Sequence, residues 1–195
     1  MALDILHPGL PNAAAEREPR RAALFCLVLL TAGCALASFA LGCATPFAAY
    51  AVIAAAMLPL SSALLVVGAA WIVNQAIGFS ALHYPHDANT VLWGVAIGAA
   101  ALAATATAAL LLSALPRISQ LAARGAALCA AFLAAYAAYE LVLFSFTPLL
   151  GGSGAFTFAI IARLGFLNVA WLLGLLAVCQ AVSVLDHVRR RRLAA

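Results

Sequence analysis

The sequence has no lysine and very little charge of either sign. Charged residues make up 8% of its 195 residues and hydrophobic residues 67%, and the mean hydropathy is +1.12. Soluble domains carry about a quarter charged residues, so this composition excludes a soluble globular domain. Because apolar stretches long enough to cross roughly 30 Å of hydrocarbon recur along the chain, we predict an all-α, polytopic protein embedded in a lipid membrane.

Sequence motifs of hydrolytic and nucleotide-binding enzymes are also missing. The chain has no HExxH, no GxSxG and no paired aspartates, so hydrolysis lacks its usual groups. It has no Walker motif, and ATP use would therefore require partner subunits. The glycine-rich run 151–154 precedes no P-loop lysine, and we interpret it as a flexible loop able to act as a lid. We predict no catalytic residues.

All ten basic residues are arginines, and most of them flank the apolar runs. Arg17, Arg20 and Arg21 precede the first run, and Arg189 to Arg192 lie at the end of the chain. The net charge of +4 therefore marks the ends of membrane spans and does not indicate nucleic-acid binding. The basic tail can also contact anionic lipid headgroups, but the topology signal is the simpler interpretation.

Six apolar segments follow one another along the chain. A single helix over 45–79 would be roughly 50 Å long, too long for one crossing, so we predict two spans there. With six spans the N-terminal arginines, Arg117 and the C-terminal arginines all lie on one side, as the positive-inside rule requires. The predicted segments are 22–43, 45–59, 61–79, 90–115, 118–146 and 156–186.

This topology predicts a bundle of six transmembrane helices in a bacterial inner membrane, with both termini cytoplasmic. Residues 1–21 form a cytoplasmic lead-in, 22–188 the transmembrane domain and 189–195 a basic cytoplasmic tail. The second segment is short, about 22 Å at the helical rise. The connections 42–46, 77–90 and 147–155 all face outward, so polar chemistry is concentrated on the outer face.

One face of the third segment carries several polar residues near its outer end. Trp71, Asn74, Gln75 and Gly78 follow i, i+3, i+4, i+7 spacing and so share that face. Two interpretations stay open for the amides, hydrogen bonding between helices or contact with a ligand. On the fourth segment the GxxxG at 94–98 is typical of a close helix crossing.

Two charged residues lie inside the last two spans. Glu140 and Arg163 are each about two turns from the outer side, at about 10 Å depth, so they can form an ion pair. Alternatively, Arg163 presents its planar set of donors to a ligand's carbonyl or phosphate groups. Tyr136 and Asn168 lie at similar depth and can line the same cavity.

The connection between the third and fourth segments is the most polar internal stretch. It contains Ser80, His83, Tyr84, His86 and Asp87. Neutral imidazole is a frequent ligand of transition metals, cobalt included, so the two histidines and the aspartate suggest a small metal site. The alternative is that these are ordinary loop histidines at the membrane interface, with the X-Pro pair forming a rigid turn.

The same stretch carries a family resemblance. Its pattern is NQ-x-x-GF, then YP, then a WG that opens the next helix, in the residues Asn74, Gln75, Gly78, Phe79, Tyr84, Pro85, Trp93 and Gly94. In a six-span chain of this size it resembles the solitary cobalamin transporters, which are similar to the S-components of energy-coupling-factor (ECF) vitamin transporters. The resemblance implies a corrinoid held in an outward-facing cavity under the outer loops, and ECF energising subunits as possible partners.

The chain departs from this family at one position. The family is associated with a cysteine thiolate in this region that ligates cobalt and helps to remove cyanide from the vitamin. Here no cysteine lies between Cys43 and Cys129, and Ser80 stands where the thiol is expected. A hydroxyl is a far poorer cobalt ligand than a thiolate. Either His83 or His86 ligates the cobalt, Cys43 reaches in, the cobalt has no protein ligand, or the serine is a replacement.

We therefore predict an uptake protein that binds cobalamin as its transported ligand and carries it across the membrane. The predicted binding residues are Asn74, Gln75, Phe79, Ser80, Tyr84 and Arg163, and the predicted metal ligands are Ser80, His83 and His86. The alternatives are a cobalt or nickel permease and a structural subunit of a membrane complex. A permease would be expected to carry histidine and aspartate within its helices, whereas here they cluster in a loop.

Overall fold

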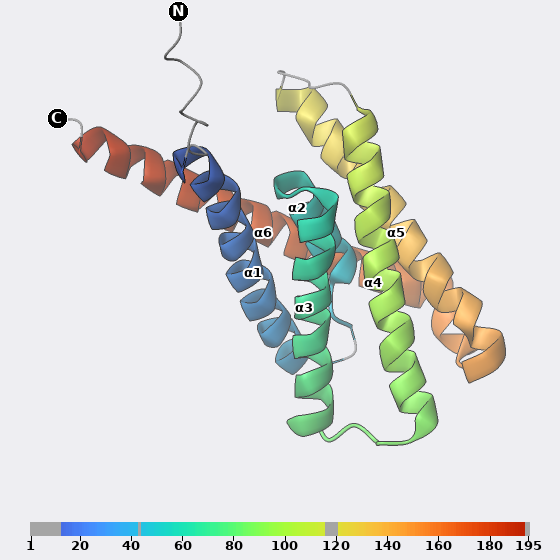
Figure 1. The fold of residues 1–195 in the computed structure, drawn as a ribbon. Coiled ribbons are helices and arrows are strands. Elements are labelled where there is room, and N and C mark those ends of the chain that lie inside the picture. Colours follow the sequence, from blue (N-terminus) through green and yellow to red (C-terminus); the bar gives the residue numbers. More distant parts are fainter. Residues whose placement is uncertain (1–12, 43, 116–120, 194–195) are drawn as a thin grey trace, which may run out of the picture.

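The protein is an all-helical bundle, as predicted from its composition. The computed structural model describes residues 13–42, 44–115 and 121–193. Arg117 and Cys43, which enter the topology and ligand hypotheses, lie outside these described residues. The elements, drawn in Figure 1, are α1 (Ala13–Leu41), α2 (Phe47–Met57), α3 (Leu60–Ser80), α4 (Ala88–Ala114), α5 (Leu121–Leu150), the short 3-10 helix η1 (Ser153–Phe156) and α6 (Phe158–Leu193).

Five of these helices are long and apolar enough to cross a membrane, and the chain is a multi-pass membrane protein. They correspond to five of the six predicted segments; the candidate spans are Arg21–Leu41, Leu60–Ser80, Ala88–Ala114, Ala122–Leu150 and Phe158–Leu185. The predicted borders of the lead-in and the tail are not helix borders, because α1 begins at Ala13 and α6 continues to Leu193. The polar ends of α1 and α6 can extend beyond the hydrocarbon as helix, so a helix border need not coincide with the border of the span.

The remaining segment, α2, is shorter than the predicted 45–59. Its 11 residues make a helix of about 16 Å, half the thickness of the hydrocarbon core. In Figure 1, α1 and α3 run in the same direction, so the chain returns between them through 42–59. The described part of that return consists of the non-helical residues 44–46 followed by the short helix, and not of a full-length spanning helix.

Every side of α2 is covered by protein. Its residues from Phe47 to Ala54 are all buried, and α2 packs against each of the other five α-helices. The connection before it is also enclosed, since Thr45 is 4% exposed and Pro46 is fully buried. Non-helical backbone is tolerated at membrane depth only where protein or a water-filled cavity surrounds it. The first turn of α2 therefore begins inside the bundle.

The predicted GxxxG crossing is present between α3 and α4. A side-chain carbon added to Gly98 would lie 2.6 Å from the Trp71 ring, and one added to Gly94 would lie 2.4 Å from Gln75 Oε1. The Trp71 Nε1–H donates a hydrogen bond to the Gly94 carbonyl at 2.9 Å. Residues four apart on one helix thus face residues four apart on the other, and the two glycines make room for two large side chains.

Substitution of Gly98 by alanine is therefore expected to destabilise the bundle. The added methyl overlaps the Trp71 ring, and overpacking of this kind costs about 1–3 kcal/mol. Thermal unfolding of the purified protein in detergent measures the loss. Gly68→Ala in α3 is the matched control, because nothing lies within 4 Å of its added carbon and alanine is the better helix former. Equal midpoints for the two variants would contradict the close crossing.

Candidate functional site

A cavity of about 270 Å³ lies where two of the connections between the helices meet α4, α5 and α6. We call the end of the bundle with the connections 42–46, 81–87 and 151–157 the loop end, and the end where α1 begins and α6 ends the arginine end (Figure 1). This cavity is lined by residues of the connection before α2, of α4, α5 and α6, and of the segment 151–156 with η1, and we call it the roofed cavity because that segment covers it. The lining residues are Ala44, Thr45, Trp93, Ile97, Tyr139, Glu140, Leu143, Gly152, Ala155, Phe156, Ile160, Leu164 and Asn168.

The roof is the segment 151–156. Gly151 and Gly152 have φ values of 78° and 83°, a region that favours glycine because it has no side chain. An added carbon on Gly152 would lie 3.4 Å from the Trp93 ring, so the roof rests on α4. The Phe156 ring packs edge-on against Phe144 at 5.3 Å. The lid interpretation of the glycine-rich run thus corresponds to a small segment placed directly over a cavity.

Polar groups of the roofed cavity also satisfy the start of α2. The Asn168 Oδ1 accepts a hydrogen bond from the Ala49 N–H at 3.2 Å, and its Nδ2–H donates to the Leu164 carbonyl at 3.0 Å. Asn168 is 5% exposed. The first N–H groups of a helix have no partner within it, so a side-chain acceptor here stabilises a helix start at membrane depth. Asn168 lines one cavity with Glu140, in agreement with their predicted depth.

Glu140 has no cationic partner in the described residues. Its Oε1 is buried and makes no hydrogen bond. Arg163 is exposed on α6, and the part of the chain that the structure describes contains no ion pair between the two. The predicted pairing is therefore not formed. Tyr136, one turn earlier on α5, donates its hydroxyl proton to the Ile161 carbonyl at 2.6 Å, which ties α5 to α6.

Asn74, a predicted binding residue, is engaged within the bundle. Its Nδ2 donates hydrogen bonds to Ser38 Oγ at 2.8 Å and to Thr45 Oγ1 at 2.9 Å. Its Oδ1 accepts a hydrogen bond from Gln75 Nε2 at 3.1 Å. Of the two interpretations, the structure supports hydrogen bonding between helices, because both amide hydrogens of Asn74 are used. They join α1, α3 and the connection before α2.

The other predicted residues lie around the end of α3, outside the lining of the roofed cavity. The Phe79 ring stacks on His86 at 5.3 Å and meets Tyr84 edge-on at 6.4 Å. An added carbon on Gly78 would lie 2.8 Å from the Tyr84 ring, so this tyrosine packs onto the helix. The Ser80 hydroxyl is exposed and donates to the Ala76 carbonyl of its own helix. Of the eight motif residues, Trp93 alone lines the cavity.

The predicted metal ligands do not form a cluster with Asp87. The Asp87 carboxylate accepts from the Thr90 N–H and from the Thr90 hydroxyl, each at 2.9 Å, and so caps α4. These hydrogen bonds lower the pKa of the Asp87 carboxyl below its ordinary value. His83 has a positive φ of 56° and forms the turn. Among the described residues there is no group of three or more His, Cys, Asp or Glu side chains.

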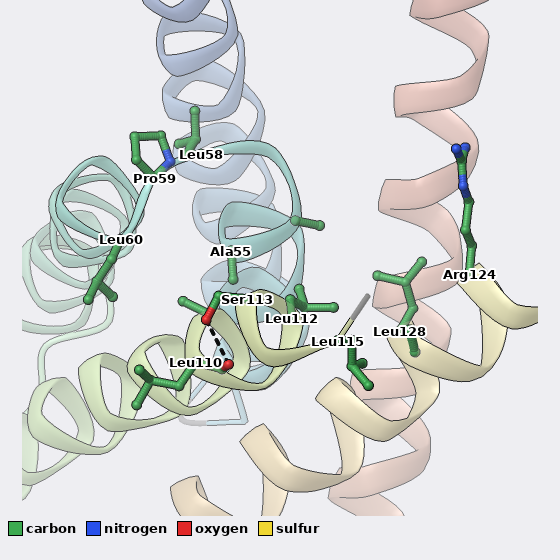
Figure 2. Close-up of a pocket in the computed structure, with 13 residues that line it drawn as sticks. Ala55, Leu58, Pro59, Leu60, Leu110, Leu112, Ser113, Leu115, Arg124 and Leu128 are labelled. Atoms are coloured by element: carbon green, nitrogen blue, oxygen red, sulfur yellow. Dashed lines mark hydrogen bonds between the residues drawn. The ribbon is translucent and has the colours of Figure 1, made fainter. Parts of the chain in front are cut away.

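A larger cavity, of about 780 Å³, lies at the arginine end (Figure 2). It is lined mainly by alanines and leucines from the end of α2, the start of α3, the end of α4 and the start of α5. Ser113 donates its hydroxyl proton to the Leu110 carbonyl at 2.8 Å, and Figure 2 shows Arg124 pointing away from the leucines of α4. Few polar groups converge here, so it offers a polar ligand little orientation. The roofed cavity is the better candidate site.

Comparisons of the chain with protein-family models, with curated protein sequences and with solved structures find no match. The resemblance to cobalamin transporters therefore rests on the motif residues of the α3–α4 stretch. In the structure those residues pack α3, the connection 81–87 and α4 together at the loop end.

Replacement of Asn74 by alanine is expected to lower the stability of the folded protein. It leaves the Ser38 and Thr45 hydroxyls without their donor, at a cost of about 1–3 kcal/mol for buried polar groups that lose a partner. Thermal unfolding in detergent measures this change. Gln180→Ala, on an exposed face of α6, is the control and should leave the midpoint unchanged. An unchanged midpoint for Asn74→Ala would restore the ligand-facing interpretation.

Proposed function

We propose that this chain is an uptake protein of a bacterial inner membrane that binds a corrinoid, with cobalamin as the representative ligand, at the loop end. The proposal begins from the resemblance of the α3–α4 stretch to the solitary cobalamin transporters. Phe79, at the end of α3, contacts both Tyr84 and His86 of the connection 81–87. Imidazole and flat aromatic rings suit a ligand that contains cobalt within a planar macrocycle.

The observation that carries the proposal is the roofed cavity at the loop end, one wall of which is Trp93 of α4. It has walls from three helices and a roof that turns on two adjacent glycines. A binding protein needs a way in, and a short segment between glycines is the kind of element that opens with little strain. Trp93 belongs both to the motif and to the cavity wall, and so links the sequence resemblance to the cavity.

Corrinoid binding requires this roof to move. Pockets for drug-sized ligands occupy about 300–1,000 Å³, the roofed cavity holds about 270 Å³, and a corrinoid is larger than a drug-sized molecule. Displacement of 151–156 away from Trp93 widens the mouth of this partly open cavity between the connections of the loop end. The ligand then lies between the Phe79, Tyr84 and His86 group on one side and α5 and α6 on the other, within reach of Arg163.

The topology assigned to this function has six crossings. The return through 42–59 counts as one, and it places both termini on the cytoplasmic side, in accordance with the arginine distribution. The loop end then faces outward and the larger apolar cavity faces the cytoplasm. Since the sequence has no Walker motif, any ATP-driven step depends on energising subunits of the ECF kind.

Purified protein equilibrated with cyanocobalamin should retain the vitamin after free ligand has been removed. The readout is the visible absorbance that co-elutes with the protein. Trp93→Ala, which removes a wall of the roofed cavity, should weaken binding by about tenfold or more, since an aromatic contact surface of this kind contributes over 1 kcal/mol. Leu65→Ala, on a side chain 75% exposed on α3, should bind as the unaltered chain does.

Absence of corrinoid from the eluted protein would refute the proposed function. Saturable binding of Co²⁺ or Ni²⁺ without any corrinoid binding would favour the permease instead.

The variant Ser80→Cys is expected to change how cobalt is bound. Thiolate is a stronger ligand for cobalt than hydroxyl, so the variant should hold the corrinoid more tightly and alter its visible spectrum. Ser113→Cys, which introduces a thiol at the arginine end of the bundle, is the control and should leave the spectrum of the bound corrinoid unchanged. If the Ser80→Cys spectrum equals that of the original chain, position 80 does not face the cobalt.

A further inference from the structure

Glu140 is an acidic residue in an unusual position. The chain has six acidic residues, and Glu140 alone lies within the five membrane spans. It lines the roofed cavity, and its Oε1 is buried without a hydrogen-bond partner. An ionised carboxylate is costly at membrane depth unless a cation or several donors face it. Its presence there calls for a chemical reason.

The groups around Glu140 are almost all neutral. From α4 the cavity receives Trp93 and Ile97, from α6 Asn168, and from the connection before α2 Thr45. Tyr136 and Tyr139 stand on α5 itself, and Tyr50 is buried in α2. Arg163 is exposed on the outside of α6, and the described residues contain no ion pair between it and Glu140. No charged partner offsets an ionised Glu140 in this arrangement.

The Tyr136 hydroxyl is a polar group close to Glu140. Its one proton is donated to the Ile161 carbonyl at 2.6 Å. A hydroxyl that has already donated its proton can only accept a further hydrogen bond. A protonated Glu140 can donate its O–H to the Tyr136 oxygen. An ionised Glu140 would instead place two hydrogen-bond acceptors against each other.

We propose that Glu140 is a proton-binding site at which proton and substrate movements are coupled. With the roof open, a hydronium ion from the solution transfers its proton: one of its O–H bonds breaks, an O–H bond forms on a carboxylate oxygen, and water is left. With the roof closed, the carboxyl is neutral and its O–H is accepted by Tyr136. Release on the cytoplasmic side breaks the carboxyl O–H bond and returns the proton to a water molecule, and no electrons are exchanged. Coupling to a substrate rests on the proposed function, whereas proton binding by Glu140 does not.

The coupling follows from the cost of enclosing a charge. Closure of 151–156 over an ionised Glu140 would leave a carboxylate in a cavity with no cation, whereas closure over the neutral acid does not. The closed, substrate-loaded form therefore carries a proton with it. An inward proton gradient can then drive uptake in a chain that has no nucleotide-binding motif of its own.

Infrared spectroscopy tests proton binding without any substrate. At neutral pH the protein should show the C=O stretching band of a carboxylic acid, and Glu140→Gln should remove it. Asp87→Asn is the control and should leave it in place. In Tyr136→Phe the band should shift, because the O–H loses its acceptor. Absence of the band from the unaltered protein, or its survival in Glu140→Gln, would overturn the proposal.

Uptake of radiolabelled cyanocobalamin into proteoliposomes tests the coupling. A proton gradient directed inward should speed uptake several-fold in the original chain, and Glu140→Gln should lose this response while still binding the vitamin. If the chain binds the vitamin but its uptake rate does not depend on the proton gradient, the coupling alone is refuted. The same holds if the gradient speeds uptake equally in Glu140→Gln. A chain that binds no corrinoid would refute the proposed function, and the infrared result would still decide proton binding.

Discussion

The structure depends on how the bundle accommodates a helix that begins inside it. The backbone N–H groups at the start of α2 are buried in the bundle, where those without a partner inside the helix need one from other parts of the protein. Asn168 supplies one from α6, and Asn74 holds the preceding connection by Thr45. The residues of α2 from Phe47 to Ala54 are enclosed, and the helix packs against each of the other five α-helices.

The candidate site is a direct result of this arrangement. Because α2 occupies only the half of the bundle toward the arginine end, the space beyond its first turn is left to side chains of α4, α5 and α6, and a cavity remains there. The residues that satisfy α2 also line that cavity, since Thr45 and Asn168 belong to both. Thr45 and Asn168 therefore stabilise the start of α2 and also supply polar groups to the cavity.

Much of the fold was predictable because long apolar runs indicate helices able to span a membrane. Five long helices and the glycine crossing of α3 and α4 follow from local patterns. The exact extent of α2 does not follow from a local pattern. Its hydropathy resembles that of a spanning helix, and only its enclosure by five neighbouring helices distinguishes it. The site was predicted in part. Glu140 and Asn168 line one cavity as predicted, whereas Tyr136, predicted to join them, does not line it. The role of Thr45 depends on the return of the chain, which no local pattern encodes.

The enclosure of α2 has a consequence for biosynthesis. A ribosome delivers α1, α2 and α3 before α4, α5 and α6, yet α2 needs surfaces from the later helices, including the Asn168 side chain. The long helices are able to insert singly as they emerge and then associate. The short helix α2 can pack only after these later helices are present. We therefore expect the last event in assembly to be the packing of α4, α5 and α6 around α2.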